Sequence, residues 1–111
     1  IVHEGKSVMI TGDIDSECHE MLAGIYGGQL STDILQVAHH GSRYSFSSRF
    51  TDEACPSAAV FQVGKNNYGH PDEGVISEYR SRGMRIFRND QDGAVGFRWS
   101  RGSGISTMTV R

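Results

Sequence analysis

Three short apolar segments, each followed by glycine or histidine, constrain the fold of this chain more than any other feature. Residues 7–11 run into a glycine and an aspartate, residues 33–38 run into a pair of histidines, and residues 58–63 run into a glycine. Short apolar runs bounded in this way are typical of buried strands. Residues 58–63 are apolar enough to be covered on both faces, which indicates a sheet packed against helices.

Helix-forming segments separate these three strands. Asp15 and Ser16 can cap a helix that a pair of glycines ends, a second helix is expected over residues 47–54, and a third from Pro71 to Arg82. The remaining segments alternate between apolar and polar residues and predict an antiparallel set of strands over residues 84–88, 94–100 and 105–110. This order of elements predicts the α/β class.

The chain of 111 residues has room for one core only. It contains no run of the roughly 20 apolar residues that a membrane span requires, so we expect residues 1–111 to be soluble by themselves. It starts at Ile1-Val2, without a methionine, where a strand is expected to begin. We therefore expect the natural protein to extend further toward the N-terminus.

Asp13 is the first candidate for a chemical role. It directly follows the first predicted strand and stands beside a glycine, where the chain can turn and expose the carboxylate. A carboxylate in that position can bridge two cations, and it can equally serve as an ordinary helix cap. Asp15 is the better candidate for capping.

His39 and His40 follow the second predicted strand, in the same layer as Asp13. Two adjacent side chains point in different directions, so we expect only one imidazole to face a given site. Imidazole together with carboxylate suits zinc or manganese, although a lone histidine is more often structural. Ser42 can donate its hydroxyl to a phosphate oxygen or cap the next helix.

The polar loop after the third strand ends at His70, at the start of the third predicted helix. Backbone N–H groups at a helix start attract anions, so the loop can hold and protonate a phosphate ester with Tyr68 and Lys65. The alternative is a solvated loop in which Asn66 and Asn67 form turns. His3 and His19 lie outside these layers, so we assign them no function and place His19 on an exposed helix face.

Four motifs together resemble the C-terminal part of the metallo-β-lactamase-fold domain of ComEC-type DNA-uptake proteins. They are TGDI, VAHHGS, VGKNNYGHP and DGAV, in residues 11–14, 37–42, 63–71 and 92–95. The resemblance covers residues 8–97. It implies that residues 1–111 are a single partial domain, the C-terminal half of an αβ/βα sandwich with a mixed sheet and helices on one face. It also implies a nuclease that degrades the non-imported DNA strand, attached to a channel in the bacterial inner membrane.

The resemblance also implies roles for individual residues. Asp13 matches an aspartate that bridges two metal ions, His39 matches a histidine ligand with His40 as the alternative, and His70 matches a histidine near the substrate. We assign His70 to phosphate binding or proton transfer. The residues expected to contact substrate are Ser42, Lys65, Asn67 and Tyr68.

The chain lacks the histidine-rich His-x-His-x-Asp-His motif of that family. We therefore expect two divalent ions, zinc or manganese, in the complete domain, and weak metal binding without nuclease activity in this chain alone. The expected partners are DNA, the N-terminal half of the domain, the membrane channel and a second copy of the chain. Two alternatives stay open: an inert DNA-binding or docking module, and a hydrolase of another phosphoester, a thioester or a lactam.

Overall fold

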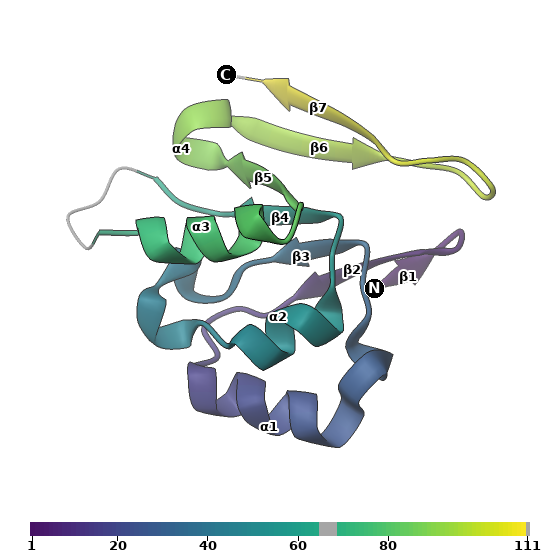
Figure 1. The fold of residues 1–111 in the computed structure, drawn as a ribbon. Coiled ribbons are helices and arrows are strands. Elements are labelled where there is room, and N and C mark those ends of the chain that lie inside the picture. The colour runs from purple at the N-terminus through teal and green to yellow at the C-terminus, as the bar shows by residue number, and fades with distance from the viewer. Residues whose placement is uncertain (65–68, 111) are drawn as a thin grey trace.

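The structure, a computed structural model, describes residues 1–64 and 69–110 and has five strands in one sheet (Figure 1). The strands lie side by side in chain order. β2 to β5 are parallel, and β1 pairs antiparallel with β2. The α/β class and the mixed sheet are thereby confirmed. The strands are β1 (Val2–His3), β2 (Lys6–Ile10), β3 (Ile34–Gln36), β4 (Ala58–Phe61) and β5 (Arg85–Arg88).

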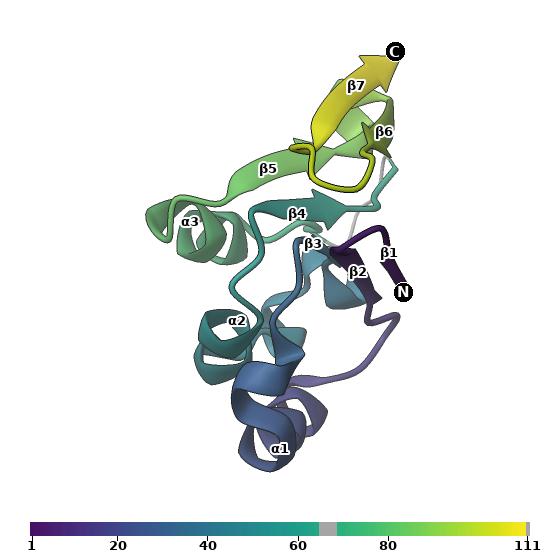
Figure 2. The same ribbon diagram turned by 90° about the vertical axis from the view of Figure 1, so that its right-hand side faces the viewer.

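Three helices connect the parallel strands: α1 (Ser16–Tyr26), α2 (Ser48–Ala54) and α3 (Glu73–Ser81). Figure 2 shows all three on one face of the sheet, as expected. Each follows a residue whose side chain accepts a hydrogen bond from an N–H group of the first turn, a cap that stabilises a helix by about 1 kcal/mol. The caps are Asp15, Ser47 and Asp72. The expected start of the third helix at Pro71 is therefore wrong, because Asp72 is the cap.

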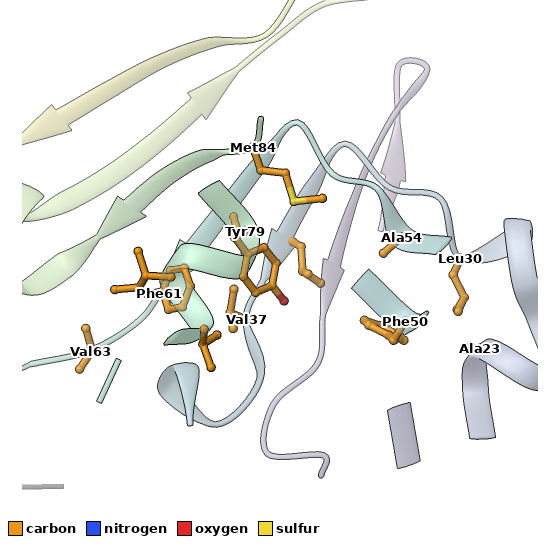
Figure 3. Packing of buried hydrophobic residues seen from close by; sticks show 13 residues of the cluster. Ala23, Leu30, Val37, Phe50, Ala54, Phe61, Val63, Tyr79 and Met84 are labelled. Carbon is orange, nitrogen blue, oxygen red and sulfur yellow. The ribbon is translucent and has the colours of Figure 1, made fainter. Parts of the chain in front are cut away.

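The core lies between the sheet and these helices (Figure 3). Side chains alternate along a strand, so Leu35, Ala59 and Phe61 point toward the helices and are at most 1% exposed. Phe61 meets Tyr79 of α3 edge to face, with ring centroids 5.6 Å apart. Burying a side chain such as Phe61 stabilises the fold by about 1.5 to 3 kcal/mol. The core therefore fixes the strand ends that carry the candidate residues.

His19 belongs to the buried side of α1. It is 4% exposed, and its ring meets Phe50 of α2 with centroids 4.4 Å apart. Its Nδ1 lies 2.7 Å from the carbonyl oxygen of Asp15, which satisfies one polar atom of the buried ring. The predicted exposure of His19 is therefore wrong, because the ring packs between two helices.

The chain after α3 differs from the expected antiparallel set. β5 pairs in parallel with β4, because α3 supplies the crossover that a parallel connection needs. Among the described strands that follow α3, the antiparallel pair is formed by β6 (Ala94–Arg98) and β7 (Ser106–Val110). The short helix α4 (Asn89–Asp92) joins β5 to this hairpin. In Figure 1 the hairpin lies beyond β5, at the side of the sheet away from β1.

The sheet face away from the helices is only partly covered. Phe97 of the hairpin meets Phe87 of β5, with ring centroids 5.5 Å apart. An open groove of about 330 Å³ lies between hairpin and sheet, and Ile10 on its wall is 65% exposed. The groove is lined by Val8, Ile10, Ile34, Gln36, Val60, Gln62, Val95, Phe97 and Trp99. Within residues 1–64 and 69–110, no helix is long and apolar enough to span a membrane.

Candidate functional site

The carboxyl ends of β2, β3 and β4 lie at the same edge of the sheet, because these strands are parallel neighbours. Asp13 follows β2 and is exposed. The N–H group of His39, after β3, donates a 2.7 Å hydrogen bond to the carbonyl oxygen of Gly12. The loop that carries Asp13 is therefore joined directly to the loop that carries the histidine pair.

Gln36, the last residue of β3, holds the loop of Asp13 in place. Its Oε1 accepts hydrogen bonds from the N–H groups of Thr11 and Gly12, at 3.0 and 3.1 Å. The Thr11 hydroxyl donates in return to the carbonyl oxygen of Gln36, at 2.7 Å. Sequence reasoning missed this residue, and the only feature that could have indicated it is a polar side chain inside an apolar strand.

The turn after β3 has an unusual backbone. It forms the 3₁₀ turn η2 (Ala38–Gly41), in which His39 and His40 have φ angles of 52° and 54°. Residues other than glycine rarely adopt this left-handed conformation, and each such residue costs of order 1 kcal/mol or more. Successive left-handed residues turn the chain sharply. Both imidazoles are thereby exposed at the sheet edge.

Gly41 allows the turn to pack closely. Its φ is 83°, and a Cβ added here would lie 2.6 Å from Phe61 and 2.8 Å from Pro71. Its carbonyl oxygen accepts a 3.0 Å hydrogen bond from the N–H of Asp72. Because Asp72 follows the segment of His70, this packing brings the histidine pair next to His70.

The three imidazoles form a cluster. The ring centroid of His39 lies 5.7 Å from that of His70 and 6.4 Å from that of His40, and the rings of His40 and His70 are 6.5 Å apart. We call these three residues the histidine cluster. Both members of the His39–His40 pair thus lie near His70, whereas the sequence led us to expect only one imidazole in the site.

Hydrogen bonds orient two of the rings. His40 Nδ1 lies 2.5 Å from the carbonyl oxygen of Gln62 and donates to it, so Nε2 is the acceptor nitrogen when the ring is neutral. His39 Nδ1 lies 3.2 Å from the hydroxyl of Ser45, a residue that is 5% exposed. Such bonds to one ring nitrogen direct the other nitrogen outward, as in histidines that bind metals.

A pocket of about 350 Å³ adjoins the cluster, and its lining includes His70. Ser42 also lines it, but this residue is 3% exposed, and its hydroxyl accepts a 3.3 Å hydrogen bond from the N–H of Tyr44. Ser42 thus caps the short helix η3 (Arg43–Ser45), which the sequence did not predict, whereas Ser47 caps the predicted helix α2. The predicted substrate contacts Lys65, Asn67 and Tyr68 lie outside the described residues.

The donor atoms of this edge are of the right kind for zinc or manganese, but their number falls short. Asp13 offers carboxylate oxygens, and His39 and His40 offer imidazole nitrogens. In the part of the chain that the structure describes, no group of three His, Cys, Asp or Glu side chains could hold a metal ion. The described residues therefore do not form a metal centre by themselves.

The sequence is similar to segments of curated proteins, although no protein-family model matches it. Competence protein ComA of Neisseria gonorrhoeae is 38% identical over 112 residues, covering 100% of this chain and 16% of that protein. ComE operon protein 3 of Bacillus subtilis is 32% identical over 107 residues, covering 96% of this chain and 13% of that protein. Recombination protein 2 of Haemophilus influenzae is 35% identical over 68 residues, covering 60% of this chain and 8% of that protein.

This chain is therefore related to a segment of proteins named for competence. It spans 16% and 13% of the length of the first two relatives. The aligned segment includes the whole histidine cluster, because the alignment to Competence protein ComA covers 100% of the chain.

Proposed function

Because the chain is related over its whole length to a segment of competence proteins, we propose that it is part of a metal-dependent phosphodiesterase that cleaves DNA during uptake. The complete protein would belong to the bacterial inner membrane, and its nuclease domain would degrade the strand that is not imported. The domain would have the metallo-β-lactamase fold, of which residues 1–111 form the C-terminal half.

The observation that carries this proposal is the convergence of three imidazoles, with ring centroids 5.7 to 6.5 Å apart, beside the loop of Asp13. Histidines gathered at the carboxyl ends of parallel strands, on a tightly packed turn, favour a ligand site over a purely structural role. The left-handed backbone of His39 and His40 supports the same view, because such strain concentrates at functional sites.

Each residue has a proposed task. Asp13, His39 and His40 supply part of the ligands of two divalent ions, and the rest come from another segment of the complete domain. Bound ions would polarise the phosphodiester and activate water. His70 binds the phosphate or transfers a proton to the leaving oxygen, and it lines the 350 Å³ pocket in which that group can lie.

A second candidate is a catalytically inert module that binds DNA or docks in the uptake machinery. It is favoured by one observation: the described residues include no group of three donors that could hold a metal ion. In this case the histidine cluster would contact phosphate without any metal.

Cleavage assays on the complete protein that contains this chain distinguish the two candidates. We expect hydrolysis of single-stranded DNA with zinc or manganese and none after chelation. Replacing His39 and His40 together by alanine should remove both bound metal and cleavage. The matched control is His3→Ala, which removes an exposed imidazole on β1 and should change neither.

Two results would contradict the proposal. Binding of DNA without cleavage under any metal condition would favour the inert module. Hydrolysis of a thioester or a lactam in place of DNA would show that the site belongs to a metal-dependent hydrolase with another substrate.

A further inference from the structure

An arginine and a tyrosine project from the chain directly after the histidine cluster. Tyr44 is 70% exposed, and the guanidinium of Arg43 lies 4.8 Å from the centroid of its ring. Arg43 also donates a 2.7 Å hydrogen bond to the Tyr44 hydroxyl. These contacts hold the two side chains together in an exposed pair.

The backbone beneath this pair is fixed. Ser42 and Ser45, on either side of it, are 3% and 5% exposed. Ser42 accepts a hydrogen bond from the N–H of Tyr44, and Ser45 contacts Nδ1 of His39. Two buried serines, the cap Ser42 and the last residue Ser45, therefore hold this short helix, and its first two residues are exposed. The position of the pair is thus coupled to that of His39.

The pair and His70 line the same pocket of about 350 Å³. A volume of this size lies in the usual range for small ligands, roughly 300 to 1,000 Å³. The wall also includes Asp72, whose Oδ1 accepts hydrogen bonds from the N–H groups of Gly74 and Val75 and is thus engaged by the start of α3. Among the described residues that line the pocket, Arg43 supplies a guanidinium that a phosphate can meet.

An exposed aromatic ring beside a guanidinium is suited to an unpaired nucleotide. Bases stack on tyrosine whatever their sequence, and arginine adds a charged contact with the phosphate. Stacking requires a base that is free of its partner strand, which favours a single strand over a duplex. Amphipathic tyrosines of this kind are otherwise found buried or at protein interfaces.

We propose that Arg43 and Tyr44 form a platform that holds one nucleotide of single-stranded DNA, with its base on the Tyr44 ring and its phosphate at Arg43. The next phosphodiester along the strand then lies toward His70. This inference rests on the proposed function because it takes DNA as the ligand. It adds a binding role for Arg43 and Tyr44, two residues outside the histidine cluster.

Binding of fluorescent oligonucleotides to the complete protein, with metal chelated so that nothing is cleaved, tests the platform. We expect Tyr44→Ala to weaken binding of a single strand about tenfold, because stacking of one base contributes roughly that much. Tyr44→Trp should restore affinity to within about twofold, since tryptophan keeps the stacking surface. The matched control is Tyr26→Ala on α1, which removes a ring that is 47% exposed and should leave affinity unchanged.

Two further measurements separate the base from the phosphate. An oligonucleotide without bases should bind the wild type and Tyr44→Ala equally. Arg43→Gln should reduce the salt dependence of binding by about 0.7 in log–log slope, as expected for one phosphate contact with a single strand. Tyr44→Ala should leave this slope unchanged.

The outcomes also separate this inference from the proposed nuclease. A protein that cleaves DNA, but whose Tyr44→Ala variant binds single strands like the wild type, would overturn the platform alone. Equal weakening of single-strand and duplex binding in that variant would also overturn it. Binding through Tyr44 without cleavage under any metal condition would support the platform and contradict the nuclease.

Discussion

His39 and Gly12 are joined by a 2.7 Å hydrogen bond between the main-chain N–H of the first and the carbonyl oxygen of the second. The bond links two loops that follow different strands and are separated by the whole of α1. Asp13 and the histidine pair therefore belong to one connected surface. A substitution that displaces one loop should therefore also displace the other.

Asp13→Asn and His70→Ala should affect the complete protein differently. Asparagine preserves the shape of exposed Asp13 but removes its charge, so metal content and cleavage should fall while stability changes by less than about 0.5 kcal/mol. His70→Ala should keep the metal and slow turnover by roughly 10² to 10⁴, the usual contribution of proton transfer. Metal analysis with single-turnover kinetics measures both. Loss of metal from the His70 variant would make His70 a ligand.

Gln36→Leu should loosen the loop of Asp13. The variant loses the hydrogen bonds that Oε1 accepts from Thr11 and Gly12. We expect a loss of about 1 kcal/mol in stability, because water can replace a partner at exposed Gly12. Metal affinity should fall about tenfold. The control is Gln36→Glu, which keeps the acceptor oxygen. Equal effects of leucine and glutamate would show that the accepted bonds do not position the loop.

Gly41→Ala should destabilise the fold by about 2 to 4 kcal/mol, because a Cβ there collides with Phe61 and Pro71 at a left-handed φ of 83°. Gly83→Ala is the control. Its φ is 78°, but nothing lies within 4 Å of an added Cβ, so it should cost only about 1 kcal/mol. Urea unfolding measures the difference. Similar losses in the two variants would mean that backbone conformation, and not close packing, limits residue 41.

Stability should fall in mild acid because of His19. Burial lowers the pKa of His19 below its ordinary value of 6.5, while the carbonyl of Asp15 and the charges of Asp15 and Glu20 partly oppose this shift. The unfolded chain then binds the proton more readily than the folded one. Protonation of His19 therefore does not reduce the free energy of unfolding above pH 6.5. As the pH drops below that value, the free energy of unfolding falls.

The measurement is urea unfolding of the wild type and of His19→Gln between about pH 7.5 and 5. The variant should be less stable near neutral pH but should lose less on acidification. If both proteins lose stability in parallel, other groups cause the acid sensitivity.

The chain by itself should associate through the open groove on the sheet face away from the helices. Ile10 on this groove is 65% exposed, and exposed apolar patches of this kind favour self-association. Ile10→Lys should reduce the apparent mass in light scattering. Met21→Lys, which charges a side chain 56% exposed on α1, is the control. A monomeric wild type at high concentration would contradict the prediction.

The helices were predictable because their boundaries depend on local chemistry. Asp15 was identified as a cap from the sequence, and it accepts a hydrogen bond from the helix that follows. The second helix was expected to begin at Ser47, which is the cap one residue before the helix starts. The start of α3 was missed because Pro71 also suits a first helical turn. The rule that ligand sites gather at the carboxyl ends of parallel strands was sufficient to group His39 with His70.

Features that depend on distant partners were not predictable. The parallel pairing of β5 requires knowing that α3 crosses the sheet, since an alternating strand looks the same in either direction. The burial of His19 depends on Phe50, a residue of another helix. Gln36 stands out in the sequence only as a polar residue in an apolar strand, and the sequence does not show that its partners are the main-chain N–H groups of the Asp13 loop.

The left-handed conformation of His39 and His40 has a consequence for evolution under selection. Glycine adopts this conformation without steric cost, so glycine at either position should relieve the backbone strain that histidine carries there. A variant library sorted only for heat resistance should accumulate glycine at both positions. A library selected for the proposed DNA cleavage should keep histidine at each position where the imidazole is needed. The difference in histidine frequency between the two libraries at positions 39 and 40 would show how strongly each imidazole is required.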